Sequence, residues 1–168
     1  MQEDLNEVAN TLLRRAKQAG VTVAVAESCT AGMLSRVLAD AQGASHYFHG
    51  GFVTYTKEHK TRALGVSASL LKEKGAVCGE VARAMAEGAL AHSSAGISAA
   101  ITGVAGPEPD EDGNPVGRIC MAVAVRGRPA QCLERNYEDI GREAIRKRAV
   151  ADALKAMTDA LASVSAAA

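Results

Sequence analysis

Residues 21–32 have the sequence VTVAVAESCTAG, and they give the clearest indication of how this chain folds. Val21 to Ala26 is a short apolar run rich in β-branched residues, which is typical of a buried strand. A buried strand that leads through a short turn into a helix is the repeating unit of α/β proteins. The helix is indicated by apolar residues at helical spacing, namely Met33, Leu34, Val37 and Leu38.

Helical and strand patterns continue to alternate along the rest of the chain. We therefore predict an α/β fold with three layers, α/β/α, as a single domain over residues 1–168. The central sheet is expected to be mainly parallel or mixed, with a hairpin at one edge, and its strand order does not follow from the sequence. The further predicted helices are Leu5–Ala19, a polar helix that ends at Leu64, Ser69–Lys74, a helix that begins at Gly79, and Gly141–Val164. The further predicted strands are Phe52–Thr54, Gly96–Ile101, Ile119–Val125 and Gln131–Tyr137. Residues Gly43–Gly51 are predicted to form a loop.

The composition excludes several classes of partner. The 168 residues contain 19 Lys plus Arg and 19 Asp plus Glu, so the formal net charge is zero, and aromatic residues make up only 3%. This balance argues against a nucleic-acid-binding protein and against a polybasic membrane-binding surface. The start of the chain is acidic and has no apolar core, so no signal peptide is expected, and no segment has the length and apolarity of a membrane span.

Cysteine and histidine spacing indicates a reduced, cytoplasmic protein without a metal. The four cysteines, at positions 29, 78, 120 and 132, form no CxxC pair and no zinc-binding pattern. His46 and His49 are three residues apart, but no carboxylate or cysteine lies close to them in the sequence. We therefore expect neither a metal nor an organic cofactor.

Ser28 is the first candidate for chemistry. It follows the buried strand directly, at the carboxyl end where open α/β sheets place their ligands. The next helix offers unpaired N–H groups that favour a phosphate or a developing oxyanion. The alternative is that Ser28 or Thr30 only caps this helix.

Tyr55 and Lys60 form the second candidate. On one continuous helix they would lie about 140° apart, but they converge if Tyr55 ends a strand and Lys60 lies in the next helix. A desolvated lysine beside a serine can act as a general base. The alternative is that Lys57, Lys60 and Arg62 form a solvated face.

Two further stretches are typical of ligand-binding positions. Thr102 and Gly103 end a predicted buried strand, and glycine there permits close approach of the backbone to a ligand; an ordinary turn is the alternative. Arg142 and Arg146 lie near the start of the last helix, where its dipole disfavours cations, so a nearby anion would explain them. A surface salt bridge to Glu138, Asp139 or Glu143 would explain them equally.

These stretches together resemble the CinA C-terminal domain family, specifically its stand-alone nicotinamide-nucleotide amidases of the PncC type. The resemblance runs from about Leu5 to Leu161. It implies an α/β/α fold and hydrolysis of nicotinamide mononucleotide to nicotinate mononucleotide and ammonia, and a homodimer is compatible with it. The matching motifs, in order, are residues 26–32 (AESCTAG), 48–55 (FHGGFVTY), Lys60, 64–66 (LGV), 75–77 (GAV), 102–107 (TGVAGP) and 115–117 (PVG).

The resemblance also implies roles for individual residues. Ser28 matches the nucleophile of the family, with Lys60 as its base and Tyr55 orienting that lysine. Thr102 and Gly103 match a conserved Thr-Gly pair of the substrate site, and Arg142 matches a basic residue that would hold the phosphate. The oxyanion would be held by backbone N–H groups near Cys29 and Thr30 or at Gly103.

Two positions depart from the family pattern. Lys57 stands where the family usually has Asn, and residues 108–114 are acidic where the family usually has a Gly-rich run. The competing hypothesis is a non-catalytic nucleotide-binding module, a regulatory partner in competence or DNA-damage responses. The presence of Ser28, Tyr55 and Lys60 together favours the amidase, because a binding module has no need of all three.

Overall fold

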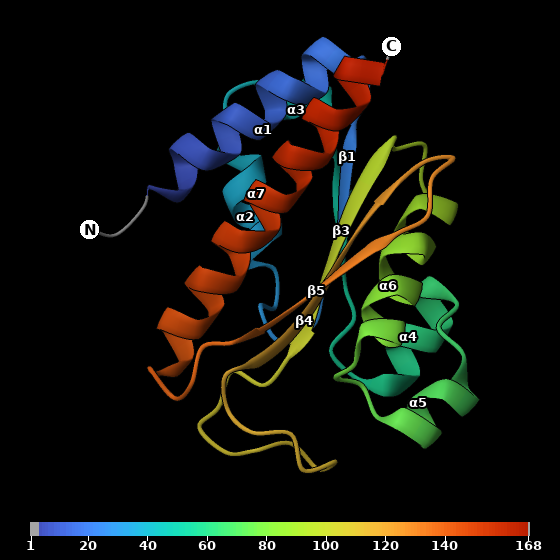
Figure 1. Ribbon diagram of the computed structural model, residues 1–168, viewed down its shortest axis with the longest axis vertical. Helices are drawn as coiled ribbons and strands as arrows, with labels where there is room; N and C mark the ends of the chain where they lie inside the picture. The colour runs from blue at the N-terminus through green and yellow to red at the C-terminus, as the bar shows by residue number, and fades with distance from the viewer. Residues whose placement is uncertain (1–3, 168) are drawn as a thin grey trace.

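The computed structural model describes residues 4–167 and shows a three-layer α/β/α arrangement (Figure 1). Its five-stranded sheet has the order β2-β1-β3-β4-β5. Strand β1 is parallel to β2 and β3, whereas β4 is antiparallel to β3 and to β5. The predicted mixed sheet with an edge hairpin is therefore confirmed. The strands are β1 Val23–Glu27, β2 Phe48–Val53, β3 Ile97–Gly103, β4 Arg118–Val125 and β5 Gln131–Asn136.

Helices cover both faces of the sheet, as Figure 1 shows. The long helices α1 (Leu5–Ala19) and α7 (Arg142–Ala167) lie on one face with α2 (Met33–Ala39) and α3 (Ala44–Tyr47). The other face carries α4 (Lys57–Leu64), α5 (Ala68–Lys74) and α6 (Gly79–Ala91). Alternate side chains of β1 enter the two cores, with Val23 and Val25 toward α1 and α7 and Ala24 and Ala26 toward α6. Burial on both faces explains why β1 has a continuous apolar sequence.

The predicted loop at Gly43–Gly51 is wrong. Residues 44–47 form the short helix α3, and β2 begins at Phe48 rather than at Phe52. Gly50 and Gly51 pair with Ala24 and Val25 of β1, so their backbone belongs to the sheet. A Cβ at Gly51 would lie 2.2 Å from Ser35 Oγ. The glycine therefore serves the packing of α2 on the sheet, although in a sequence it is typical of a loop.

The topology places the carboxyl ends of β1, β2 and β3 at one edge of the sheet. The chain leaves β1 to form β2 on one side, then crosses the other face through α4, α5 and α6 to form β3 on the opposite side of β1. Connections that diverge in this way leave a crevice at the strand ends, which is the usual ligand position in open α/β sheets.

Candidate active site

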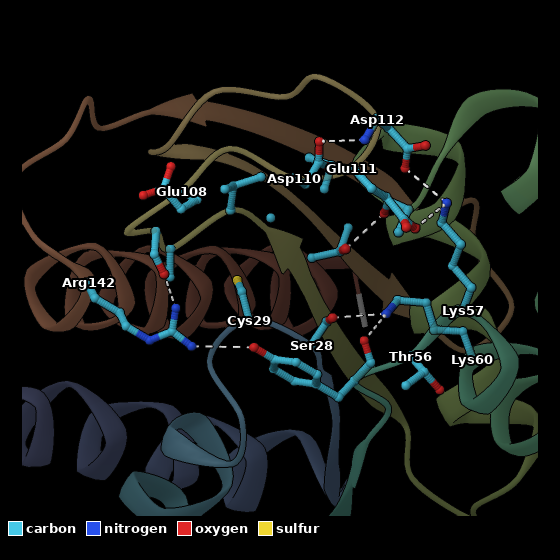
Figure 2. Close-up of a pocket in the computed structure, with 18 of the residues that line it drawn as sticks. Ser28, Cys29, Thr56, Lys57, Lys60, Glu108, Asp110, Glu111, Asp112 and Arg142 are labelled. Carbon is cyan, nitrogen blue, oxygen red and sulfur yellow. Dashed lines mark hydrogen bonds and ion pairs between the residues drawn. The ribbon is translucent and has the colours of Figure 1, made fainter.

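A cavity of about 530 Å³ lies at this edge of the sheet (Figure 2). Its walls come from segments far apart in the sequence: the turn after β1, the start of α4, the connection between α5 and α6, the loop after β3 and the start of α7. Of the predicted site residues, those that line the cavity are Ser28, Cys29, Tyr55, Lys60, Thr102, Gly103 and Arg142. Thr30 lies in the turn behind it, with its side chain buried.

Ser28 and Lys60 are in direct contact, as Figure 2 shows. Lys60 Nζ lies 2.9 Å from Ser28 Oγ, and it also lies 2.8 Å from the carbonyl oxygen of Thr54 and 3.3 Å from that of Tyr55. Lys60 is only 1% exposed, so the solvated-face interpretation is wrong for this lysine. Arg62, by contrast, has a side chain that is 79% exposed.

Burial changes the protonation of Lys60. Desolvation lowers its pKa to about 8, because the charged ammonium loses its hydration inside the protein. A neutral amine has two hydrogens and one lone pair, which match the two carbonyl oxygens and the Ser28 hydroxyl. In this state the hydroxyl donates its proton toward the amine, which is the arrangement that a general base requires.

Glu27, which the sequence reasoning missed, holds the turn that carries Ser28. Its carboxylate is fully buried and accepts hydrogen bonds from Leu34 N (2.8 Å), Ser35 N (2.9 Å), Ser35 Oγ (2.7 Å) and Thr30 Oγ1 (2.7 Å). Glu27 thus satisfies the first amides of α2, the task that the cap hypothesis gave to Ser28 or Thr30. That hypothesis is wrong for both residues. The sequence signal that could have indicated this role is the position of Glu27, a charged residue directly after an apolar strand.

The backbone after Ser28 forms a tight turn. Ala31 has a φ of 48°, and its amide donates to the carbonyl of Ser28. Ser28 N donates to Ile101 O (2.9 Å), whereas Cys29 N and Thr30 N donate to no backbone carbonyl within residues 4–167. The Cys29 amide contacts its own thiol, and the Thr30 amide is an available donor of this turn.

The two arginines of α7 have different surroundings. Arg142 lines the cavity and donates to the carbonyl of Gly106 and to Tyr55 Oη, the latter at 3.3 Å. Arg146 donates through Nε to the carbonyl of Cys29 at 2.7 Å, so it ties α7 to the turn that carries Ser28. Among the ion pairs of the described residues, neither arginine joins a carboxylate, and Glu143 pairs with Lys147.

Tyr55 and Cys29 present different groups to the site. The Tyr55 side chain is exposed and its hydroxyl contacts Arg142, so this residue reaches Lys60 through its backbone carbonyl. The Cys29 thiol is buried, and desolvation raises its pKa to about 12. A thiol with such a pKa is a poor nucleophile at neutral pH.

Thr102 and Gly103 shape the wall of the cavity. The Thr102 hydroxyl donates to the carbonyl of Ala76 at 2.8 Å and thereby joins β3 to the connection before α6. A Cβ at Gly103 would lie 2.4 Å from Ile119 Cδ1 and 2.7 Å from the carbonyl oxygen of Arg118. Only glycine therefore fits between β3 and β4 at this point.

The structure adds two negative findings for the part of the chain that it describes. Within residues 4–167, no group of three or more His, Cys, Asp or Glu side chains is arranged to hold a metal ion. Over the same residues, no helix combines the length and apolarity needed to span a bilayer.

The fold and the cavity define a three-layer α/β domain with a buried serine–lysine pair at the carboxyl edge of its sheet. The profile of the CinA C-terminal domain matches residues 5–161, and the chain belongs to this family. The predicted resemblance is thus confirmed at the level of the family.

Curated relatives carry names from the competence field. The chain is 44% identical over 142 residues to a CinA-like protein of Geobacter sulfurreducens, which covers 84% of this chain and 34% of that protein. It is 46% identical over 127 residues to a putative competence-damage inducible protein of Symbiobacterium thermophilum, covering 76% of this chain and 29% of that protein. The chain therefore spans about a third of the length of these relatives.

Solved structures match over nearly the full length of both chains. The competence/damage inducible protein CihA of Agrobacterium tumefaciens has a TM-score of 0.89 at 38% identity, with 95% of this chain and 96% of that chain covered. A CinA superfamily protein of Klebsiella pneumoniae has a TM-score of 0.91 at 31% identity, with 95% and 99% covered.

Proposed function

We propose that this chain is an amidohydrolase that converts nicotinamide mononucleotide to nicotinate mononucleotide and ammonia. The observation that carries the proposal is the 2.9 Å contact between Ser28 Oγ and the buried Lys60 Nζ. The substrate follows from the motif resemblance described above, and the cavity supports it with a nucleophile, a base and a cation in one enclosure.

The reaction proceeds in two halves. In the first, neutral Lys60 takes the Ser28 proton while Oγ forms a bond to the carboxamide carbon; the C–N bond then breaks, and Lys60 returns the proton to the leaving nitrogen as ammonia departs. In the second, Lys60 takes a proton from water and the water oxygen attacks the ester carbon. The bond between that carbon and Oγ then breaks, the proton returns to Ser28 Oγ, and the carboxylic acid leaves and loses its remaining proton to solvent.

Two sets of hydrogen-bond donors are proposed to stabilise negative charge on the substrate, one for the oxyanion and one for the phosphate. The amides of Cys29 and Thr30, which donate to no backbone carbonyl within residues 4–167, are the candidate donors to the oxyanion in both halves. Arg142 donates one N–H group to the carbonyl of Gly106 and one to Tyr55 Oη. The remaining N–H groups of its guanidinium are available for the 5′-phosphate.

The test is ammonia release from nicotinamide mononucleotide by the purified protein, with and without EDTA. We expect release at the same rate in both, because no step uses a metal. Ser28→Ala is the matched control and should release none. A wild-type protein that binds the nucleotide without turnover would instead support the non-catalytic binding module.

A further inference from the structure

The loop that connects β3 to β4, residues 104–117, lies across the cavity from Ser28 and is called the roof loop here (Figure 2). Four of its carboxylates line the cavity: Glu108, Asp110, Glu111 and Asp112. The proposed reaction gives these side chains no part in the chemistry. Their contacts indicate what they do.

The tip of the roof loop is internally ordered. Asp110 Oδ1 accepts hydrogen bonds from Asp112 N at 3.1 Å and from Asn114 N at 2.7 Å, and Asp110 Oδ2 accepts from Asn114 Nδ2 at 2.7 Å. Arg118 in turn donates to Asn114 Oδ1. The tip is therefore a compact turn that keeps Glu111 and Asp112 in fixed relation to each other.

Lys57 joins this tip to the opposite wall of the cavity. Its Nζ lies 2.9 Å from Glu111 Oε1 and 3.0 Å from Asp112 Oδ2. Lys57 is the first residue of α4, where the helix dipole disfavours a cation, so the two carboxylates account for its placement. These same carboxylates raise its pKa.

The absence of a side chain at Gly75 makes room for the Asp112 carboxylate. A Cβ at this position would lie 2.7 Å from Asp112 Oδ2, so a side chain there would displace the carboxylate that Lys57 binds. The roof loop is also held at its other end, because Arg142 donates to the carbonyl of Gly106. The Lys57 contacts do not involve Arg142, so they hold the loop independently of a phosphate bound there.

We propose that Lys57 is a positioning residue whose ion pairs with Glu111 and Asp112 latch the roof loop over the cavity and thereby control access to Ser28. The latch acts on entry and retention of the substrate and takes no part in the bond changes. Its effect on nicotinamide mononucleotide rests on the proposed function, whereas its effect on access does not.

The first experiment reads access without turnover. In the Ser28→Cys background, the alkylation rate of the introduced thiol by iodoacetamide is measured by peptide mass spectrometry, with and without Lys57→Met. Ion pairs of this exposure contribute little each, so we expect a rate about two- to tenfold higher without the lysine. Hydrogen exchange of residues 104–117 should rise by a similar factor.

Three variants make this result specific. Lys57→Arg keeps the charge and should restore the wild-type rates, whereas Glu111→Gln combined with Asp112→Asn should match Lys57→Met. Lys72→Met is the control, because Lys72 is an exposed lysine of the neighbouring helix α5 outside the cavity. Unchanged alkylation in Lys57→Met, or an equal rise in Lys72→Met, would overturn the latch.

The second experiment uses the proposed reaction. The Lys57 charge also lowers the pKa of Lys60, so the assay is run well above pH 8, where Lys60 is neutral in both proteins. With nicotinamide mononucleotide, Lys57→Met should then raise KM about two- to tenfold and leave kcat near its wild-type value, because Ser28 and Lys60 remain paired. A fall in kcat with an unchanged KM would contradict a role in access. If the wild-type protein releases no ammonia, the proposed function fails, and the alkylation rates still decide the latch.

Discussion

Ser28 and Lys60 share one hydrogen bond, and the proposed reaction uses them as a unit. Replacing Ser28 by Ala should lower turnover by several powers of ten and leave the melting temperature close to that of the wild type, because Glu27 and not Ser28 caps α2. Lys60→Ala should cause a comparable loss and the double variant little more, since residues that act as a unit are not additive. The measurements are ammonia release at saturating substrate and thermal melting. Near-normal turnover in Ser28→Ala would refute the nucleophile.

The pH dependence of the rate reports on Lys60. Only the neutral amine can accept the Ser28 proton, and burial brings the pKa of Lys60 to about 8. The rate should therefore rise with pH up to about 8 and level off above it. The measurement is a pH profile of kcat/KM on nicotinamide mononucleotide. A profile that is flat from pH 6 to 9 would mean that Lys60 is not the base.

Arg142 is expected to read the phosphate of the substrate. Arg142→Ala should weaken use of the mononucleotide by the equivalent of about 1.5–3 kcal/mol and change little for the ribosyl substrate without phosphate, because the lost contact is to the phosphate. The measurement is kcat/KM for both substrates in both proteins. Equal kcat/KM values for the two substrates in the wild type would show that the protein does not bind the phosphate.

At the level of the helices, Glu27 couples the start of α2 to the end of β1. Glu27→Gln keeps the size of the side chain but presents an NH₂ group to some of the four donors that the carboxylate satisfies. We expect a loss of about 1.5–3 kcal/mol in the free energy of unfolding, measured by urea denaturation. Glu7→Gln, at an exposed position in the first turn of α1, is the control and should cost less than about 0.5 kcal/mol. Equal costs in the two variants would contradict the special role of Glu27.

For the molecule as a whole, the buried Lys60 makes stability depend on pH. Its pKa is about 8 in the folded chain against 10.5 for the ordinary side chain. Between these values the unfolded chain binds one more proton at this position than the folded chain, so the free energy of unfolding should rise with pH from about 8 to about 10.5. The measurement is urea denaturation across this range for the wild type and Lys60→Met. Parallel curves for the two proteins would contradict the shifted pKa.

Local patterns predicted most of the helices and strands. Helix α1 has the predicted bounds, because periodic apolar residues and a terminal glycine are local features that need no partner. The start of β2 was missed, because Gly50 and Gly51 owe their strand conformation to pairing with β1, and Ser35 leaves no room for a side chain at Gly51. Such a requirement arises between segments and leaves no periodic pattern in either.

Ser28, Lys60 and Arg142 were each recognisable as candidates from residue type and local position, and the family resemblance joined them into one site. Their geometry depended on packing: Ser28 and Lys60 are 32 residues apart, and Arg142 meets Tyr55 across 87 residues. Whether a lysine is a solvated surface charge or a buried base depends on what covers it, and residues distant in the sequence provide that cover. For the same reason the capping role of Glu27 and the contacts of Lys57 with the roof loop became visible only once the chain was folded.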